Sequence, residues 1–206
     1  MRQLILIVFV LGFIFNSYSQ QTGTYTDARD GKVYKTVTIG NLIWFAENLA
    51  YNAGSGCWAY DNDSSNITKY GYLYNYETAQ NVCPSGWHLP SDKEWQTLET
   101  TLAMSSSDAN STGYRGAPIG TNLKNSSGWN SNGNGNNQSG FAALPGGYRV
   151  ANSTFLGEGY NGCWWSSTTD EASNVWSRGL IYNYPGVCRY SDDKAVGFSV
   201  RCVQVQ

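Results

Sequence analysis

Apolar and polar residues alternate over residues 33–39, and this pattern predicts a β-strand. Its valines and isoleucine lie on one face, and its threonines lie on the other. Gly40 and Asn41 separate this strand from the apolar run 42–45. Two turn residues between two such runs predict a β-hairpin. Further on, tyrosines at alternate positions of residues 70–76 predict a short extended segment with one tyrosine face.

Two stretches have the pattern of a helix. From Ser91 to about Ala103, apolar residues recur at i, i+3 and i+7, which places them on one helical face. Ser91 and Glu94 fit the S-x-x-E capping box, in which two side chains satisfy two free amides. A shorter helix is expected from Glu77 to Val82, because the proline that follows the next cysteine disfavours helical geometry there.

Polar loops and then strands fill the second half of the chain. Residues 104–140 read as mostly loop, and residues 130–139 are almost entirely Asn, Ser and Gly, so they must lie outside the core. Strands are expected at residues 147–150, 163–167, 175–178 and 196–203. This order predicts an α+β fold with short antiparallel sheets, two helices and long loops, rather than repeated βαβ units.

The first 19 residues have the pattern of an export signal. Arg2 precedes an apolar run from Leu4 to Phe15, and serines precede a cleavage site before Gln20. The run is about 12 residues long, shorter than the ~20 that cross a bilayer, and no other segment is apolar enough. We expect a signal peptide at 1–19, a polar leader at 20–30 and a single domain at 31–206.

Charge and composition narrow the classes of partner. The whole chain has a net charge of −2, and loss of Arg2 with the signal leaves 12 basic and 15 acidic residues, or −3. There is no basic stripe to neutralise phosphates, so nucleic acid is not an expected partner. The 8 Trp, 15 Tyr and 23 Gly favour short strands, turn-rich loops and an aromatic-rich surface or core.

The cysteines and the single histidine give no sign of a catalytic or zinc site. Five cysteines follow the predicted cleavage site, and disulfides are expected in an exported chain. The odd number leaves at least one cysteine unpaired or paired with another chain. There is no CxxC motif, so a zinc site is not expected. No nucleophile motif accompanies His88, for which we expect a structural role.

An oxygen-rich run at residues 61–66 has the side chains of a calcium loop. It lacks the glycine at position 6 and the acidic residue at position 12 of an EF-hand. Calcium (Ca²⁺) therefore remains an alternative without support, and we expect no cofactor. A solvated turn rich in Asp and Asn is the simpler interpretation.

Aromatic residues in loops supply the candidate binding residues. Aromatic faces stack on sugar rings and anchor protein interfaces. One group lies in the polar loop near residue 129 and another in the crowded segment 182–190, and ordinary loop packing is the alternative for both. The candidates are Trp129, Asn130, Arg178, Tyr182, Tyr184, Arg189 and Tyr190. Core positions are expected for the other tryptophans considered, Trp44, Trp87, Trp95, Trp164 and Trp165.

Several motifs together carry a family resemblance. They include DGKVYKTVTIGNLIWFAENLAY, CPSGWHLPSDKEW, ALPGGYR, CWWSSTT and GFSVRCV. From about Asp27 to Val203 the chain resembles the Fibrobacter succinogenes major paralogous domain family, which occurs in exported bacterial proteins and has no characterised function. More distantly, it resembles the fold shared by C-type lectins and formylglycine-generating enzymes. That resemblance implies a C-type-lectin-like fold, with both termini in one sheet and long loops that present ligand-binding residues.

The resemblance also implies a disulfide between Cys83 and Cys202. The chain departs from the family near residue 67, where many members carry a cysteine that would pair with Cys57. The resulting hypothesis pairs Cys163 with Cys188 across neighbouring strands and leaves Cys57 over. Formylglycine-generating enzymes hold copper with a close cysteine pair near the C-terminus, and this chain has no such pair.

The function that these observations favour is an exported, non-catalytic binding module, secreted or at the bacterial cell surface. Its expected partner is a carbohydrate or an extracellular protein, held by long loops on a disulfide-stabilised scaffold. The alternative is a structural protein of extracellular or cell-surface assemblies, linked through the odd cysteine. An enzyme of the formylglycine-generating type is the least supported hypothesis.

Overall fold

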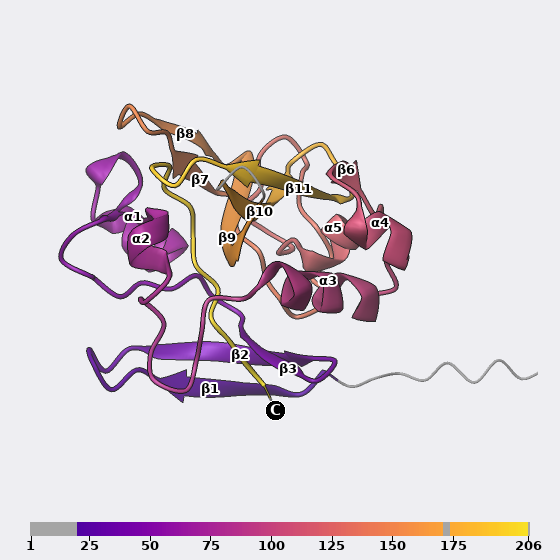
Figure 1. The fold of residues 1–206 in the computed structure, drawn as a ribbon, viewed down its shortest axis with the longest axis horizontal. Helices are drawn as coiled ribbons and strands as arrows, with labels where there is room; N and C mark the ends of the chain where they lie inside the picture. Colours follow the sequence, from indigo (N-terminus) through magenta and orange to yellow (C-terminus); the bar gives the residue numbers. More distant parts are fainter. Residues whose placement is uncertain (1–19, 171–173, 206) are drawn as a thin grey trace, which may run out of the picture.

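The computed structural model describes residues 20–170 and 174–205, so the predicted signal peptide at 1–19 lies outside the described residues. The fold is α+β and rich in short strands, as predicted (Figure 1). Its helices are short: α1 (Ser65–Tyr70), α2 (Tyr76–Ala79), α3 (Asp92–Thr101), α4 (Ser106–Asn110) and α5 (Ile119–Leu123), with a 3₁₀ turn at Tyr60–Asn62. No helix in the described part of the chain has the length and apolar character needed to span a membrane.

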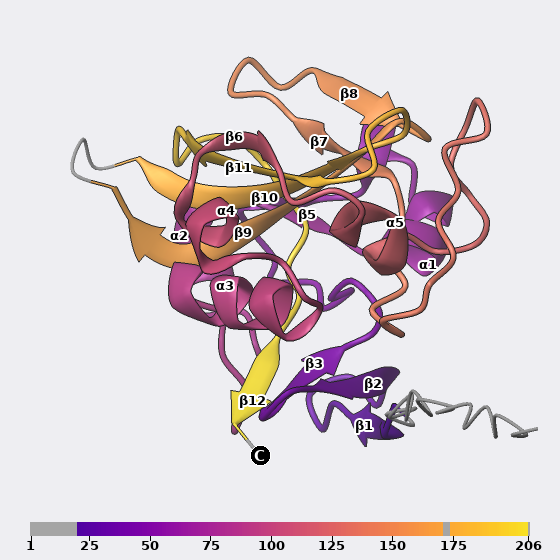
Figure 2. The same cartoon turned by 90° about the vertical axis from the view of Figure 1, so that its right-hand side faces the viewer.

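Two main sheets enclose α3 between them (Figures 1 and 2). The smaller sheet has the antiparallel order β1 (Thr22–Thr26), β2 (Val33–Ile39), β3 (Leu42–Phe45), β12 (Val203–Val205). The larger has the order β6 (Gly113–Arg115), β11 (Val187–Asp192), β10 (Val175–Ile181), β9 (Asn161–Thr169), β7 (Gly146–Arg149), β8 (Phe155–Glu158). A two-stranded ribbon joins β4 (Cys57–Trp58) to β5 (Leu73–Tyr74).

The predicted hairpin is confirmed, and the polar leader needs correction. β2 and β3 pair in the register Val37↔Trp44 and Ile39↔Leu42, joined by the expected turn. Part of the leader forms β1, which pairs with β2 along its whole length. β1 lies at an edge and four of its five residues are exposed, so it lacks the apolar alternation by which a strand is recognised in sequence.

Both predicted helices are observed, and a side chain caps the N-terminus of each. In α3, Ser91 Oγ accepts the amide of Glu94 at 3.2 Å, and Glu94 Oε2 accepts the amide of Ser91 at 2.7 Å. The shorter helix begins and ends earlier than predicted, because Asn75 caps α2 by accepting the amide of Thr78 at 3.1 Å. The helices α4 and α5 lie in the segment 104–140 that was expected to be mostly loop, and each is only five residues long. The helix α1 was not predicted, and it is only six residues long and mostly polar.

Tryptophans fill the core, as expected from their positions. Trp44, Trp95, Trp164 and Trp165 are at most 2% exposed. Trp87 is half-buried and packs against Phe45, with 4.5 Å between ring centroids. Much of the apolar area that stabilises the fold therefore lies in these rings.

The chain's last segment joins several parts of the fold. The expected disulfide between Cys83 and Cys202 is present. Next to it, the buried Arg201 donates hydrogen bonds to Asn48 Oδ1 and to the backbone carbonyls of Phe45, Phe141 and Ala142, at 2.6–3.1 Å.

The strand expected at residues 196–203 is observed only as β12. The preceding residues bond to several partners in turn instead of to one neighbouring strand. Phe198 exchanges both backbone bonds with Tyr74, and the amide of Ser199 bonds to the carbonyl of Cys163.

Candidate binding surfaces

Trp129, one of the predicted binding residues, is not available to a ligand. It is 4% exposed, and its indole Nε1 donates to the carbonyl of Ala143 at 3.0 Å. The Lys124 ammonium lies 5.0 Å from the ring centroid. The side chain therefore belongs to the interior of the loop. Asn130 is exposed, and its backbone amide donates to the carbonyl of Gly159.

Arg178 and Arg189, two further candidates, face α3 instead of solvent and are 1% and 7% exposed. Arg178 binds Asp92 and Glu99 of α3 at 2.8 Å each, and Arg189 holds both carboxylate oxygens of Asp92 at 2.8 and 2.9 Å. Arg115 binds Glu99 at 2.8 Å. These arginines fasten the larger sheet to the helix, which corrects the prediction that Arg178 and Arg189 contact a ligand.

The surroundings of Asp92 set its protonation. Burial alone would raise the pKa of this carboxyl, but the hydrogen bonds and charges of Arg189 and Arg178 outweigh burial and lower it below its usual value. The carboxylate is therefore ionised and contributes to the attachment of α3 at neutral pH.

A buried lysine connects the two loops in which binding residues were expected. Lys124 Nζ donates to the backbone carbonyls of Ile181, Tyr182 and Tyr184. Burial lowers the pKa of this ammonium to about 8. The segment at 182–184 is thereby tied to the end of α5.

Three tyrosines form an exposed aromatic surface, which we call the tyrosine face: Tyr114, Tyr184 and Tyr190. Tyr114 and Tyr190 are 58% and 42% exposed. The ring of Tyr114 contacts those of Tyr184 and Tyr190 edge-on, with centroids 5.0 and 6.1 Å apart. The predicted Tyr182 packs separately against Tyr160, at 5.1 Å. Tyr114 was missed because β6 lies in a segment that reads as loop.

The predicted bond between Cys163 and Cys188 is wrong, since both are free thiols. The two residues oppose Gly179 from either side, on β9 and β11, with β10 between them. Two strand spacings amount to about 9.5 Å, whereas bonded cysteines have Cα atoms less than ~7 Å apart. Burial raises the pKa of both thiols, that of Cys188 to about 11. Cys57 is also free and half-buried.

His88 and the oxygen-rich run lie in structural surroundings. The imidazole Nε2 of His88 is 2.7 Å from Glu94 Oε1, beside the capping box of α3. Asp63 Oδ1 accepts the amide of Ser65 at 2.9 Å, where α1 begins. Among residues 20–170 and 174–205, no three His, Cys, Asp or Glu side chains are grouped to hold a metal ion.

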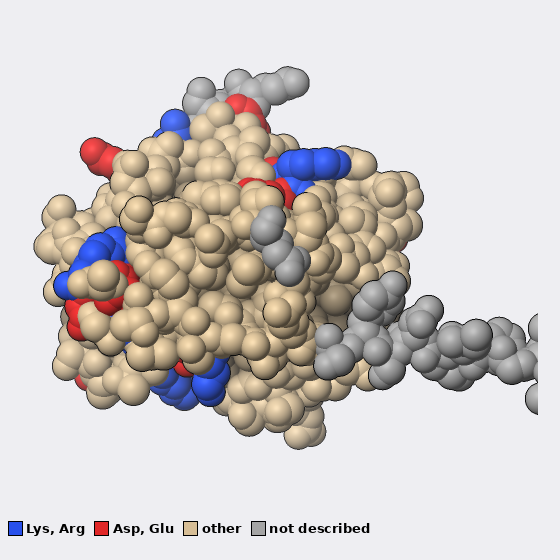
Figure 3. All heavy atoms as spheres, turned by 90° about the horizontal axis from the view of Figure 1, so that it is seen from below, with Lys and Arg blue, Asp and Glu red and all other residues tan. Residues whose placement is uncertain are grey.

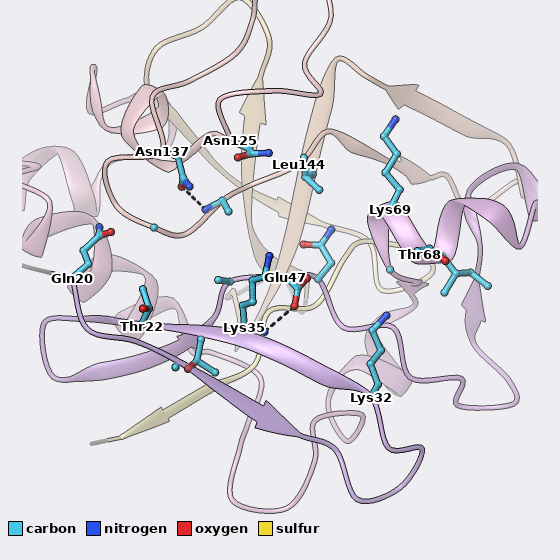
Figure 4. A pocket seen from close by; sticks show the side chains of 18 residues that line it. Gln20, Thr22, Lys32, Lys35, Glu47, Thr68, Lys69, Asn125, Asn137 and Leu144 are labelled. Atoms are coloured by element: carbon cyan, nitrogen blue, oxygen red, sulfur yellow. Dashed lines mark hydrogen bonds between the residues drawn. The ribbon is translucent and has the colours of Figure 1, made fainter.

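One concave feature was not anticipated from the sequence. A cleft of about 630 Å³ lies between β1, β2, α1 and the loop 125–144 (Figure 4). We call it the basic cleft. Hydroxyl, amide and charged side chains line much of it, including Thr22, Lys32, Lys35, Glu47, Thr68 and Lys69.

The basic cleft concentrates positive charge in an acidic chain. Three of the six lysines in the sequence line it, with Glu47 as the only carboxylate in the described lining. Within the described chain, none of these lysines has an ion-pair partner within 4.0 Å. Glu47 Oε2 instead accepts the backbone amide of Lys35 at 2.8 Å. Figure 3 shows that Lys and Arg form a few separate groups on a face that is otherwise largely uncharged.

Buried tyrosines support two of the three ammonium groups. Lys32 Nζ lies 5.5 Å from the ring centroid of Tyr34, and Lys69 Nζ lies 4.4 Å from that of Tyr70. Cation–π attraction of this kind favours positions over the rings. The sequence could not reveal the cluster, because the three lysines come from two distant segments.

Comparison with known proteins gives a family. The Fibrobacter succinogenes major domain matches residues 37–204. No curated protein and no solved structure matches the chain. The match covers most of the sequence and includes the end of β2, the capped helix α3, the larger sheet and the disulfide, so the chain belongs to the Fibrobacter succinogenes major domain family.

Proposed function

We propose that this protein is an exported, non-catalytic binding module of C-type-lectin-like architecture that recognises a glycan in the basic cleft. The cleft volume is the observation that carries the proposal. About 630 Å³ lies in the range of ~300–1,000 Å³ that is typical of small-ligand sites. Its hydroxyl and amide side chains suit a ligand covered with hydroxyl groups.

The architecture supports this proposal by placing rigid elements around the cleft. β1 and β2 form one wall, and β2 is held by β3, which pairs with β12 beside the disulfide. The opposite wall begins at α1, and Asn48 Nδ2 ties the end of that helix through the carbonyl of Tyr70 at 2.8 Å. A preformed site loses little conformational entropy on binding. We propose the C-type-lectin-like fold and export from the cell together with this binding function.

A glycan array with cleft-filling variants tests the function. Thr22 and Thr68 are exposed and line the cleft from opposite walls, so Thr22→Trp and Thr68→Trp should obstruct it. We expect wild-type protein to bind at least one class of glycan and both variants to bind it at least tenfold more weakly. Thr26→Trp is the matched control, because Thr26 is exposed on the same strand outside the cleft. A blank array, or equal loss in the control, would count against a glycan site in the cleft.

The tyrosine face favours a second candidate function, attachment to another protein in an extracellular or cell-surface assembly. Tyrosine is enriched where protein interfaces gain most of their affinity. Tyr114 and Tyr190 present two large exposed rings on neighbouring strands. Cross-linking of the protein on intact cells, compared with a Tyr114→Ser/Tyr190→Ser variant, tests this candidate. Partners retained equally by the variant would exclude the tyrosine face as their contact.

A further inference from the structure

We infer that the basic cleft selects acidic saccharides, whose carboxylate groups pair with the ammonium groups of Lys32, Lys35 and Lys69. This inference rests on the proposed function and specifies its ligand class. Its basis is that one cleft combines lysines without ion-pair partners and polar side chains, and that its described lining has no aromatic ring on which a sugar could stack.

Charge is the first argument. Three lysines and one glutamate give the described lining a formal charge of +2, whereas the whole chain carries −2. Ion pairs within the described chain neutralise none of these lysines. Close like charges without a partner repel one another, and an anionic ligand relieves that repulsion. Positive potential in a concave site also attracts anions from solution.

The absence of an aromatic wall is the second argument. Neutral sugars gain much of their affinity by stacking on aromatic rings. The described lining of the cleft contains no Phe, Trp or Tyr side chain. Tyr34 and Tyr70 are buried, and their ring faces contact Lys32 and Lys69 and are not available to a ligand. Affinity in this cleft must therefore come mainly from charge and hydrogen bonds.

The arrangement of the lysines is the third argument. Lys32 and Lys35 come from the wall formed by β2 and the turn before it, and Lys69 comes from α1 on the other wall (Figure 4). Charges on both walls suit a ligand with several carboxylates along its length. Thr22, Thr68 and Asn125 supply hydroxyl and amide groups near them, as the hydroxyls of a sugar require.

An acidic peptide would share the charge but not the rest of this chemistry. Peptides are held mainly by sheet edges, apolar grooves or aromatic-lined channels, and of these only a sheet edge, that of β1, borders the cleft. The apolar side chains in the described lining are two alanines, Ile67 and Leu144, and they are outnumbered by polar ones. The saccharide is therefore the ligand that we propose, and the peptide becomes an outcome of the test.

Calorimetric titration of the full mature chain with two matched oligosaccharides tests the inference. The probes are tetragalacturonic acid and its neutral counterpart, a tetramer of galactose, which share most of the sugar skeleton and differ in the carboxylates. We expect the acidic tetramer to bind at least tenfold more tightly at 50 mM salt. That preference should shrink at 500 mM salt because salt screens exposed charges.

Lysine variants assign the effect to the cleft. Lys32→Gln, Lys35→Gln and Lys69→Gln should each weaken binding of the acidic tetramer about two- to fivefold, as for exposed charge pairs. Lys93→Gln is the control, since Lys93 is exposed on α3 outside the cleft and the substitution removes the same charge.

The outcomes separate this inference from the proposed function. Equal binding of both tetramers, lost on Thr22→Trp but unaffected by the lysine variants, would overturn acidic selectivity and leave a glycan site standing. Absence of binding to either tetramer, together with a blank array, would overturn both. Equally tight, lysine-dependent binding of a short poly-glutamate peptide would show that the cleft recognises anionic polymers in general, and would overturn the saccharide assignment.

Discussion

Replacing Arg178 with methionine separates a structural role for this side chain from a role in ligand binding. Arg178 is 1% exposed, and its guanidinium joins the carboxylates of Asp92 and Glu99, at 2.8 Å each. Methionine fills much of the same volume without charge or hydrogen-bond donors. In the variant, each carboxylate stays buried and retains one arginine, Arg189 on Asp92 and Arg115 on Glu99.

The expected loss follows from the cost of burying a charge. Removing one partner of a buried ion pair costs ~3–5 kcal/mol, because the remaining charge has lost its hydration without full compensation. Each carboxylate keeps one arginine, so we expect the lower end of that range, about 3 kcal/mol. Folded domains are stable by only ~5–15 kcal/mol, so the loss is a large fraction of the total.

Urea unfolding followed by tryptophan fluorescence measures this loss. With a slope of ~2 kcal/mol/M, a loss of 3 kcal/mol lowers the midpoint by about 1.5 M. Arg149→Met is the control, since Arg149 stacks on Trp58 at 3.9 Å and forms no ion pair within the described chain. An unchanged midpoint for Arg178→Met, accompanied by loss of ligand binding, would refute our reasoning and restore Arg178 as a binding residue.

Three further predictions concern stability. Replacing Cys83 and Cys202 with alanine should cost about 5 kcal/mol on the chain-entropy model, since the bond spans 119 residues; a loss below 1 kcal/mol in urea would contradict this. Because the pKa of Asp92 is lower in the folded protein than the value near 4 of the unfolded chain, the ionised carboxylate stabilises the fold above pH 4, and this stability is lost as the pH falls below 4. Asp92→Asn should therefore reduce the loss of stability with falling pH. An unchanged acid side of the stability profile would exclude Asp92 as the cause of that loss. Gly120→Ala should destabilise by about 3 kcal/mol, because a Cβ there would lie 1.9 Å from the carbonyl oxygen of Gly186; unchanged thermal melting would contradict it.

Elements with local signals were predictable, and those that depend on distant partners were not. The hairpin carries its own turn, and α3 carries its own capping box, so both could be identified within about ten residues. β11 has no such signal, because its buried charged residue Arg189 faces Asp92 of α3. β1 is exposed except at the half-buried Tyr25, and it is defined by its pairing with β2.

The candidate sites show the same limit. The sequence grouped Tyr184 and Tyr190 in the segment 182–190, whereas Tyr114, whose ring contacts both, comes from a strand some 70 residues earlier. Trp129 stands in a run of polar residues, and only the folded loop reveals that its ring is covered. The basic cleft combines β2 with α1, and no local pattern connects Lys35 with Lys69.

The bonds of Arg201 impose an order of events on folding. Its guanidinium donates hydrogen bonds to the backbone carbonyls of Phe45, Phe141 and Ala142, and the neighbouring Cys202 forms a disulfide with Cys83. A chain still being synthesised cannot complete these contacts until residues 201 and 202 are present. Since the pairing is between segments far apart in sequence, the search for them is slow. A nascent copy therefore stays incompletely packed until residues 201 and 202 have been made, and premature termination just before residue 201 yields a product without this connector.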